Sequence, residues 1–166
     1  LAGVLGFDQI KKLAAIPAVG GIKYTAATVF DYLRIKEEIG PDFRVFSGSD
    51  ELAMAGLGFG ADAIIGSFYN LIPEVFIAIF DAIVNNDVAR AKELQATANA
   101  IIFFSLNYSA TAVIKRGMAW QGADAGYCRK PFDNFLTETE EEDLKDAWRR
   151  LKRERNIEGV AFLDAI

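Results

Sequence analysis

The sequence predicts an α/β fold, because strand-like segments alternate with helical segments and glycine or proline residues separate them. The strand-like segments are residues 21–25, 43–46 and 63–65, and the helical segments that follow them are residues 28–39, 50–59 and 71–84. Elements that alternate in this way form parallel strands joined by right-handed crossovers. The strands are short, as barrel strands usually are.

Glycine and proline mark the ends of the helices in the first half of the chain. Residues 7–16 place apolar side chains at helical spacing up to Pro17, so they predict a helix before the first strand. Gly40 and Gly60 each follow a helical segment, where a residue that tolerates a left-handed backbone ends a helix readily. The apolar segment 71–84 predicts a helix buried in the core.

The second half of the chain predicts helices without strands between them. Asp87 is suited to cap one long helix that would run to about Lys115. The apolar stripe of this helix is wide enough to contact two surfaces, one of which could be another subunit. A glycine-rich segment, residues 117–132, follows it.

The last helix begins with a capping signal. Thr137 and Glu140 have the spacing of a capping box, and acidic residues at the start and basic residues at the end suit the helix dipole. Its apolar face is formed by Leu144, Ala147, Trp148 and Leu151. We therefore expect residues 1–86 to form three strand–helix units and residues 87–166 to form a helical extension packed on them, as one structural unit.

Composition and charge exclude several classes of protein. The 166-residue chain is 52% hydrophobic and 25% charged, which is typical of a folded domain with a core. The net charge of −5 argues against a nucleic-acid partner, since such a partner requires a basic face. The chain contains no histidine, which excludes Ser-His-Asp triads, histidine general bases and histidine-ligated zinc.

Cysteine content and hydropathy predict a cytoplasmic protein without a metal site or a membrane partner. The single Cys128 can form neither an internal disulfide nor a thiolate metal cage, so a reducing compartment is expected. The first residues lack the basic and apolar segments of a signal peptide. The apolar run 71–84 is shorter than the ~18 residues of a membrane helix. It also contains Pro73, Glu74 and Asp81.

Lys23 is a candidate nucleophile because of its place in a strand. Both faces of a parallel sheet are normally covered by apolar residues. The two-residue period of a strand puts Lys23 and Thr25 on one face, which could line a barrel lumen. Burial favours the neutral amine, which attacks carbonyls to form a Schiff base whose iminium accepts electrons when a carbon–carbon bond is made or broken. Placement alone leaves a lysine in a buried ion pair as an equal alternative.

Polar residues also follow the next two strands. Residues 47–51, Ser-Gly-Ser-Asp-Glu, open a helix whose free amides and carboxylates suit a polyhydroxylated ligand. On local grounds, helix capping by Ser49 or Asp50 explains this segment better. Residues 66–70, Gly-Ser-Phe-Tyr-Asn, follow the third strand. Because the loops after strands meet at one mouth of an α/β barrel, we expect convergence there of Lys23, Gly48, Asp50, Glu51 and Ser67.

Together these segments resemble the N-acetylneuraminate lyase family, within the superfamily of class I pyruvate-dependent aldolases. Residues 21–25, Gly-Ile-Lys-Tyr-Thr, are similar to a motif of the whole superfamily and point only to the mechanism. Residues 48–51 and 66–70 resemble the sialic acid lyases more specifically, although Phe68 replaces a residue that is commonly threonine. The resemblance extends through nearly the whole chain.

The resemblance implies a Schiff-base aldolase that cleaves N-acetylneuraminate to N-acetylmannosamine and pyruvate. It implies that Lys23 forms the Schiff base with pyruvate, without a metal or another cofactor, and that Thr25 lies beside the substrate. It also implies that the sugar is bound by Gly48, Asp50, Glu51 and Ser67. The family is usually tetrameric, so a homotetramer is expected.

The resemblance also implies that the chain is part of a larger enzyme. A whole (β/α)8 barrel needs about 250 residues, whereas this chain resembles only the last three strands with their helices and the C-terminal helices. The loop that holds the pyruvate carboxylate and the tyrosine that relays the proton would lie in an N-terminal half-barrel. We expect this chain to contact that half-barrel, either as part of one longer polypeptide or as a separate chain.

Other functions stay open on the sequence alone. A dihydrodipicolinate synthase or a 2-keto-3-deoxy sugar acid aldolase would share Lys23, although Asp50, Glu51 and residues 67–70 argue against the first. A catalytically inactive fragment could instead act as an assembly module through the helix that starts at Asp87. Replacing Lys23 would distinguish an enzyme from such a module.

Overall fold

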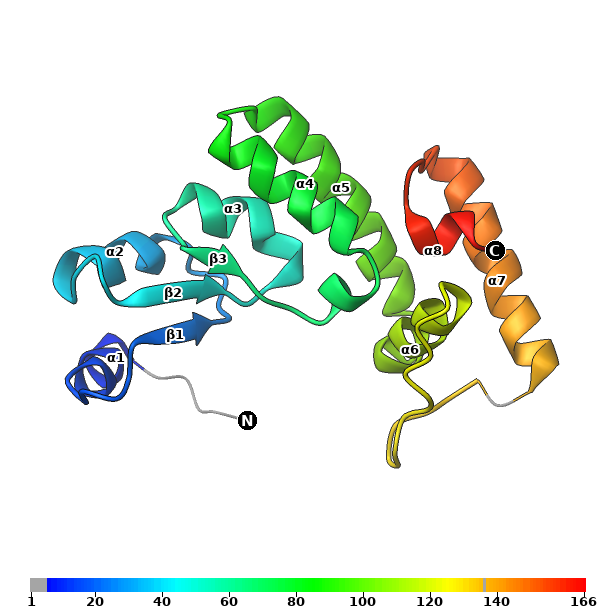
Figure 1. Cartoon of the computed structure of the whole chain (residues 1–166), viewed down its shortest axis with the longest axis horizontal. Coiled ribbons are helices and arrows are strands. Elements are labelled where there is room, and N and C mark those ends of the chain that lie inside the picture. Colours follow the sequence, from blue (N-terminus) through cyan, green and yellow to red (C-terminus); the bar gives the residue numbers. More distant parts are fainter. Residues whose placement is uncertain (1–5, 136) are drawn as a thin grey trace. The chain divides into compact units, whose positions relative to one another are not determined.

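A three-stranded parallel sheet forms the centre of the first part of the computed structural model, which describes residues 6–135 and 137–166 (Figure 1). β1 (Gly21–Tyr24) pairs with β2 (Arg44–Ser47), which pairs in turn with β3 (Ala63–Ile64). The register places Lys23 beside Phe46. The predicted α/β class and the three predicted strands are therefore confirmed.

The contacts of the chain divide it into two compact units. The first ends at Gly66 and contains the sheet, and the second begins at Ser67 and is helical. The helices of the first unit are α1 (Phe7–Ala14), α2 (Phe30–Glu38) and α3 (Ala53–Gly58). The helix predicted for residues 50–59 begins as a separate 3-10 turn, η1 (Asp50–Leu52).

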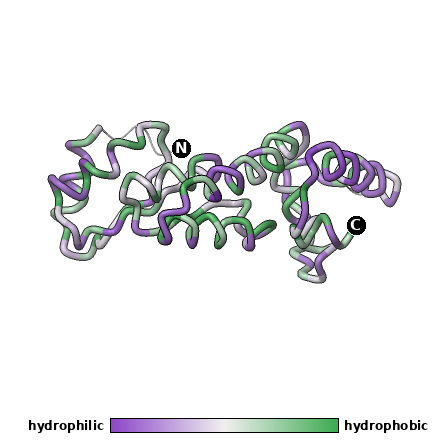
Figure 2. Tube along the Cα trace, turned by 90° about the horizontal axis from the view of Figure 1, so that it is seen from above, coloured by the Kyte–Doolittle hydropathy of each residue, from purple (hydrophilic) through white to green (hydrophobic). Residues whose placement is uncertain are grey.

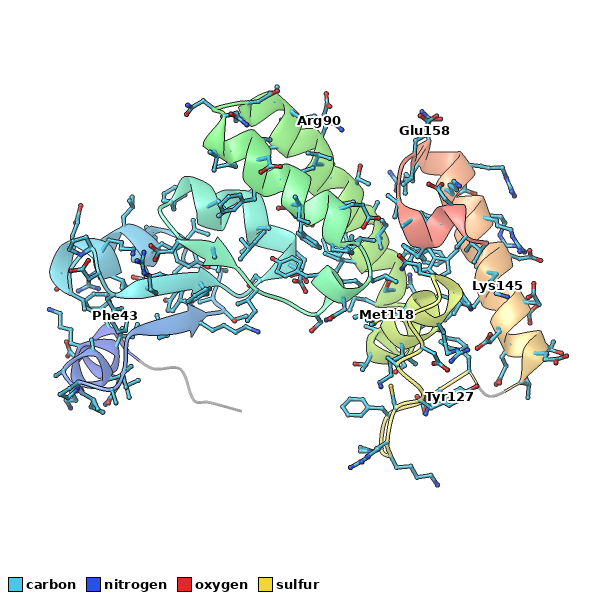
Figure 3. The ribbon with its side chains drawn as sticks, viewed as in Figure 1. Phe43, Arg90, Met118, Tyr127, Lys145 and Glu158 are labelled. Atoms are coloured by element: carbon cyan, nitrogen blue, oxygen red, sulfur yellow. The ribbon has the colours of Figure 1, made fainter. Side chains whose placement is uncertain are left out.

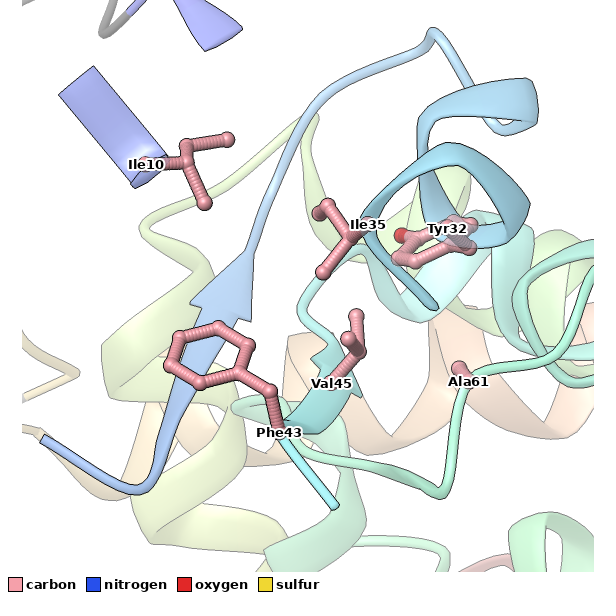
Figure 4. Packing of buried hydrophobic residues seen from close by; sticks show 6 residues of the cluster. All are labelled: Ile10, Tyr32, Ile35, Phe43, Val45 and Ala61. Atoms are coloured by element: carbon pink, nitrogen blue, oxygen red, sulfur yellow. The ribbon is translucent and has the colours of Figure 1, made fainter. Parts of the chain in front are cut away.

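One face of the sheet packs against α1 and α2. Along β2 the side chains alternate, so that Val45 and Ser47 are buried while Arg44 and Phe46 are exposed. Val45 belongs to a core cluster shown in Figure 4, whose buried members are Ile10, Tyr32, Ile35, Phe43, Val45 and Ala61. This core fixes which face of the strands points away from the helices.

The second unit consists of helices. They are η2 (Phe68–Asn70), α4 (Pro73–Val84), α5 (Val88–Ser105), α6 (Ala110–Trp120), α7 (Glu138–Arg155) and α8 (Ala161–Asp164). α4 and α5 pack side by side (Figure 1). Tyr127, which Figure 3 labels, lies in the segment after α6, and the centre of its ring is 4.9 Å from the guanidinium of Arg116 in α6.

Two predicted helix starts are confirmed. The Asp87 carboxylate accepts a hydrogen bond from the Arg90 amide at 3.0 Å, so it caps α5. Thr137 and Glu140 form the predicted capping box of α7, and the four residues predicted for its apolar face are all buried. Figure 2 shows that the rest of α7 is mostly hydrophilic.

The single long helix predicted from Asp87 to about Lys115 is wrong. It is two helices, α5 and α6, bent by 114° at a short break. The Asn107 side-chain amide donates to the carbonyl oxygens of Phe103 and Phe104, at 3.3 and 3.1 Å, and so satisfies the last carbonyls of α5. Ser109 then has an extended backbone at the start of α6.

No single helix within the described ranges is both long and apolar enough to cross a bilayer. α5 and α6 meet that criterion only when they are taken together across their bend, and then by length and composition alone.

The predicted glycine-rich segment 117–132 begins too early, because Gly117 lies inside α6. A Cβ atom added to Gly117 would overlap Leu71 Cδ1, and Leu71 is fully buried. Gly117 therefore lets α6 approach the segment before α4 closely, which the residues around the glycine in the sequence cannot show.

Replacing Gly117 by alanine is expected to lower the free energy of unfolding by about 1–3 kcal/mol, because the added methyl group would overlap the fully buried Leu71 side chain. Urea unfolding of the complete polypeptide measures this change. Gly58→Ala is the matched control, since nothing lies within 4 Å of a Cβ atom there. Equal stability of the two variants would contradict the packing role of Gly117.

Candidate active site

Lys23, Thr25 and Gly48 meet where β1 and β2 end. A Cβ atom on Gly48 would overlap Thr25 Oγ1 and would lie only 2.8 Å from Lys23 Cε. The Gly48 amide donates to the Tyr24 carbonyl oxygen at 2.9 Å, which holds Gly48 directly beside the end of β1. Glycine is needed here because any side chain would displace the lysine or the threonine.

Asp50 lies next to the end of β3. Its side chain is nearly buried at the start of η1, and a Cβ atom on Gly66 would overlap its carboxylate. The Ile65 amide donates to the Ser47 carbonyl oxygen at 2.9 Å, so pairing with β2 continues almost to Gly66. Glu51 follows Asp50 within η1 and is half-buried. The carboxyl ends of all three strands therefore contribute to one region.

Helix capping by Ser49 does not account for this segment. Ser49 occupies the N-cap position of η1, but its side chain forms no cap hydrogen bond. Ser67, the last predicted site residue, is exposed and begins the second unit. The other predicted site residues lie in the first unit.

The face that carries Lys23 is open, in contrast to the covered face expected from the sequence. Lys23 and Thr25 are exposed, and Phe46 beside Lys23 is 37% exposed. A shallow depression of about 400 Å³ on this face is lined by Gly20, Gly21, Ile22, Lys23, Arg44 and Phe46. The face is open because β1 and β3 are edge strands of a sheet that does not close. In a closed barrel this face would line the interior.

The alternative role of Lys23 in an ion pair finds no support in the described part of the chain, where Lys23 forms no salt bridge. Lys36 of α2 does form one, with its Nζ 2.5 Å from Asp62 Oδ2. Burial raises the pKa of Asp62, but hydrogen bonds from Lys36 and the Val45 amide outweigh this effect and hold that pKa below its usual value. This pair holds α2, β2 and the start of β3 together.

Two buried hydroxyl groups beneath the site were not predicted. Tyr32 of α2 and Ser47 of β2 are fully buried, and their hydroxyl oxygens are 3.1 Å apart. Tyr32 is an aromatic residue within an amphipathic helix, which the sequence does not distinguish from any other core residue. Ser47 could have been noticed as the polar residue that strand alternation places on the buried face.

No group of three or more histidine, cysteine, aspartate or glutamate side chains that could hold a metal ion occurs within residues 6–135 and 137–166. The described residues bring an amine, a hydroxyl and carboxylates to the strand ends.

Comparison with known proteins agrees with this arrangement. The model of the dihydrodipicolinate synthetase family matches residues 2–150. N-acetylneuraminate lyase 2 of Escherichia coli O6:H1 is 37% identical over 134 residues, which are 80% of this chain and 44% of that protein. The chain spans about half the length of the relatives that it matches.

Two solved structures also match nearly all of this chain and about half of their own length. Ruminococcus gnavus sialic acid aldolase, in a form described as a catalytic lysine mutant, is 27% identical with a TM-score of 0.82, over 94% of this chain and 52% of its own. N-acetylneuraminate lyase from Fusobacterium nucleatum complexed with pyruvate is 29% identical with a TM-score of 0.77, over 90% of this chain and 49% of its own. These matches confirm the predicted fold, the C-terminal part of a (β/α)8 barrel followed by further helices.

Proposed function

The chain belongs to the dihydrodipicolinate synthetase family, and on this basis we propose that it is the lysine-bearing part of an aldolase that cleaves N-acetylneuraminate to N-acetylmannosamine and pyruvate. The observation that carries the proposal is the contact of Lys23 and Thr25 with Gly48 at the carboxyl ends of the strands. Active sites of (β/α)8 barrels are built at that end. The relatives named as N-acetylneuraminate lyases support this choice of substrate.

In the proposed reaction, Lys23 acts as the nucleophile. Its neutral amine adds to the ketone of the open-chain sugar acid, and loss of water gives a protonated Schiff base. A base takes the proton of the hydroxyl group on the β carbon, counted from the imine carbon. The bond between the α and β carbons breaks, the β carbon leaves as the aldehyde of N-acetylmannosamine, and the electron pair of the bond moves into the iminium to form an enamine. Protonation of the resulting enamine and hydrolysis release pyruvate and the free lysine. One of the similar structures is a Ruminococcus gnavus sialic acid aldolase described as a catalytic lysine mutant, and this supports a lysine in the role of nucleophile.

The other predicted residues have supporting roles in this proposal. The Thr25 hydroxyl lies beside the lysine chain and would bind the substrate near the reacting carbon, while Gly48 leaves room for both side chains. The carboxylates of Asp50 and Glu51 would accept hydrogen bonds from the sugar hydroxyls. The Ser67 hydroxyl would donate hydrogen bonds to them or accept hydrogen bonds from them. No metal or organic cofactor takes part.

The open sheet face determines what else the reaction needs. Lys23 is exposed in this chain, so the water-excluding walls around the Schiff base must come from residues that complete the barrel. We propose that a preceding half-barrel supplies them, together with the carboxylate-binding loop and the proton-relaying tyrosine. A homotetramer and a cytoplasmic location remain predictions.

The substrate is tested by measuring pyruvate release from N-acetylneuraminate by the complete polypeptide, as its gene encodes it. We expect release at a catalytic rate and no comparable release from 2-keto-3-deoxy sugar acids. Preference for a 2-keto-3-deoxy sugar acid, or condensation of pyruvate with aspartate semialdehyde, would replace the proposed substrate by that of another aldolase. Absence of turnover with all of them would favour an assembly module.

A further inference from the structure

We propose that Tyr32 is a positioning residue for Lys23, which acts through the Ser47 hydroxyl and the Tyr24 carbonyl on the opposite side of the sheet. This inference rests on the proposed function, because it assigns to a buried residue of α2 the task of holding the reactive amine in place. It extends the site beyond the side chains that line the open face.

The Tyr32 hydroxyl joins the ends of two strands. Its oxygen lies 3.2 Å from the Tyr24 carbonyl oxygen and 3.1 Å from the Ser47 hydroxyl oxygen. The Tyr32 hydroxyl is the donor in both contacts, and because a phenol has one proton, the Tyr24 carbonyl oxygen and the Ser47 hydroxyl oxygen share it as acceptors. The same carbonyl accepts the Gly48 amide at 2.9 Å. This chain of hydrogen bonds ties the last residue of β1 to the last residue of β2.

The strand ends that Tyr32 joins are those that carry the site. Lys23 and Thr25 flank Tyr24, so their side chains point to the face opposite that of the Tyr24 side chain. Both side chains contact Gly48, which follows Ser47. A shift of the end of β1 against that of β2 would therefore move the amine and the hydroxyl of the site. A misplacement of about 1 Å can cost an enzyme about 10²-fold in rate.

Packing keeps the ring of Tyr32 in place independently of its hydroxyl. The Tyr32 ring meets the Tyr24 ring edge-on, with centroids 5.5 Å apart, and Tyr32 is completely buried. A Cβ atom on Gly56 would overlap Ser47 Oγ, so α3 packs directly against the serine side chain. Tyr32→Phe therefore removes the hydrogen bonds and leaves the shape of the core intact.

The test uses Tyr32→Phe in the complete polypeptide with pyruvate as the probe. We expect the rate of the borohydride-trapped adduct at saturating pyruvate to fall about tenfold, and kcat for cleavage to fall with it while KM changes by less than about twofold. Ser47→Ala removes the other hydroxyl group and should lower the same rate by a smaller factor, which gives a second reading should Tyr32→Phe fail to fold.

Ile35→Val is the matched control. Ile35 is also fully buried in α2 and belongs to the same core, but it takes no part in the hydrogen-bond chain. This variant should unfold at a lower urea concentration and trap pyruvate at the wild-type rate. Equal slowing by Ile35→Val, or a wild-type rate in folded Tyr32→Phe and Ser47→Ala, would overturn the positioning role and leave the proposed function standing. A wild-type protein that traps no pyruvate would instead overturn the proposed function itself.

Discussion

Replacing Lys23 by alanine is expected to abolish both pyruvate trapping and aldol cleavage, with a loss of at least about 10³-fold in kcat. The reason is chemical, because Lys23 supplies the amine that lies with Thr25 at Gly48. Pyruvate release, followed with a coupled assay, measures the loss. The fold should survive, since Lys23 is exposed and forms no salt bridge in the described part of the chain.

Lys23→Arg separates the loss of the nucleophile from the loss of charge. Arginine keeps the positive charge but stays protonated, so it cannot attack a carbonyl. This variant should be as inactive as Lys23→Ala. Substantial activity in either variant would remove Lys23 from the reaction and favour an assembly role for the chain.

Replacing Gly48 by alanine is expected to lower the rate of adduct formation by about 10²-fold. The added methyl group would overlap Thr25 Oγ1 and press on Lys23 Cε, so that the amine loses its position although it is still present. Rapid quenching with borohydride at several times after mixing with pyruvate measures this rate.

Gly58→Ala is the control for that variant. It adds a methyl group in the same unit, at a position where nothing lies within 4 Å, and should trap pyruvate at the wild-type rate. If Gly48→Ala also traps at the wild-type rate, the contact of the lysine and the threonine with Gly48 has no part in the chemistry.

Local sequence signals predict those parts of the fold that depend on neighbouring residues. Asp87 and the pair Thr137 and Glu140 cap their helices by contacts within one turn, so both caps follow from the sequence. The break between α5 and α6 does not follow from the sequence, because the apolar spacing continues through it. The Asn107 side chain satisfies the last carbonyl groups of α5 at this break. The role of Gly117 is equally hidden, because its close contact is with Leu71, far away in the sequence.

The site is predictable to the extent that strand geometry determines it. Alternation places Lys23 and Thr25 on one face, and the rule that loops meet at strand ends brings them to Gly48. The burial that the sequence predicts for Lys23 is not found, because covering this face of the sheet requires further strands. Tyr32 was missed because its role follows from a contact with the main chain of β1, which no sequence pattern reveals.

The most direct test of Lys23 as the nucleophile is to incubate the complete polypeptide with pyruvate, reduce it with borohydride and map the modified peptide by mass spectrometry. Reduction converts a Schiff base into a stable amine on the lysine that formed it. We predict one adduct, on Lys23, in the peptide that also contains Thr25. An adduct on another lysine, or none in a folded protein, would contradict the assignment of Lys23 as the nucleophile.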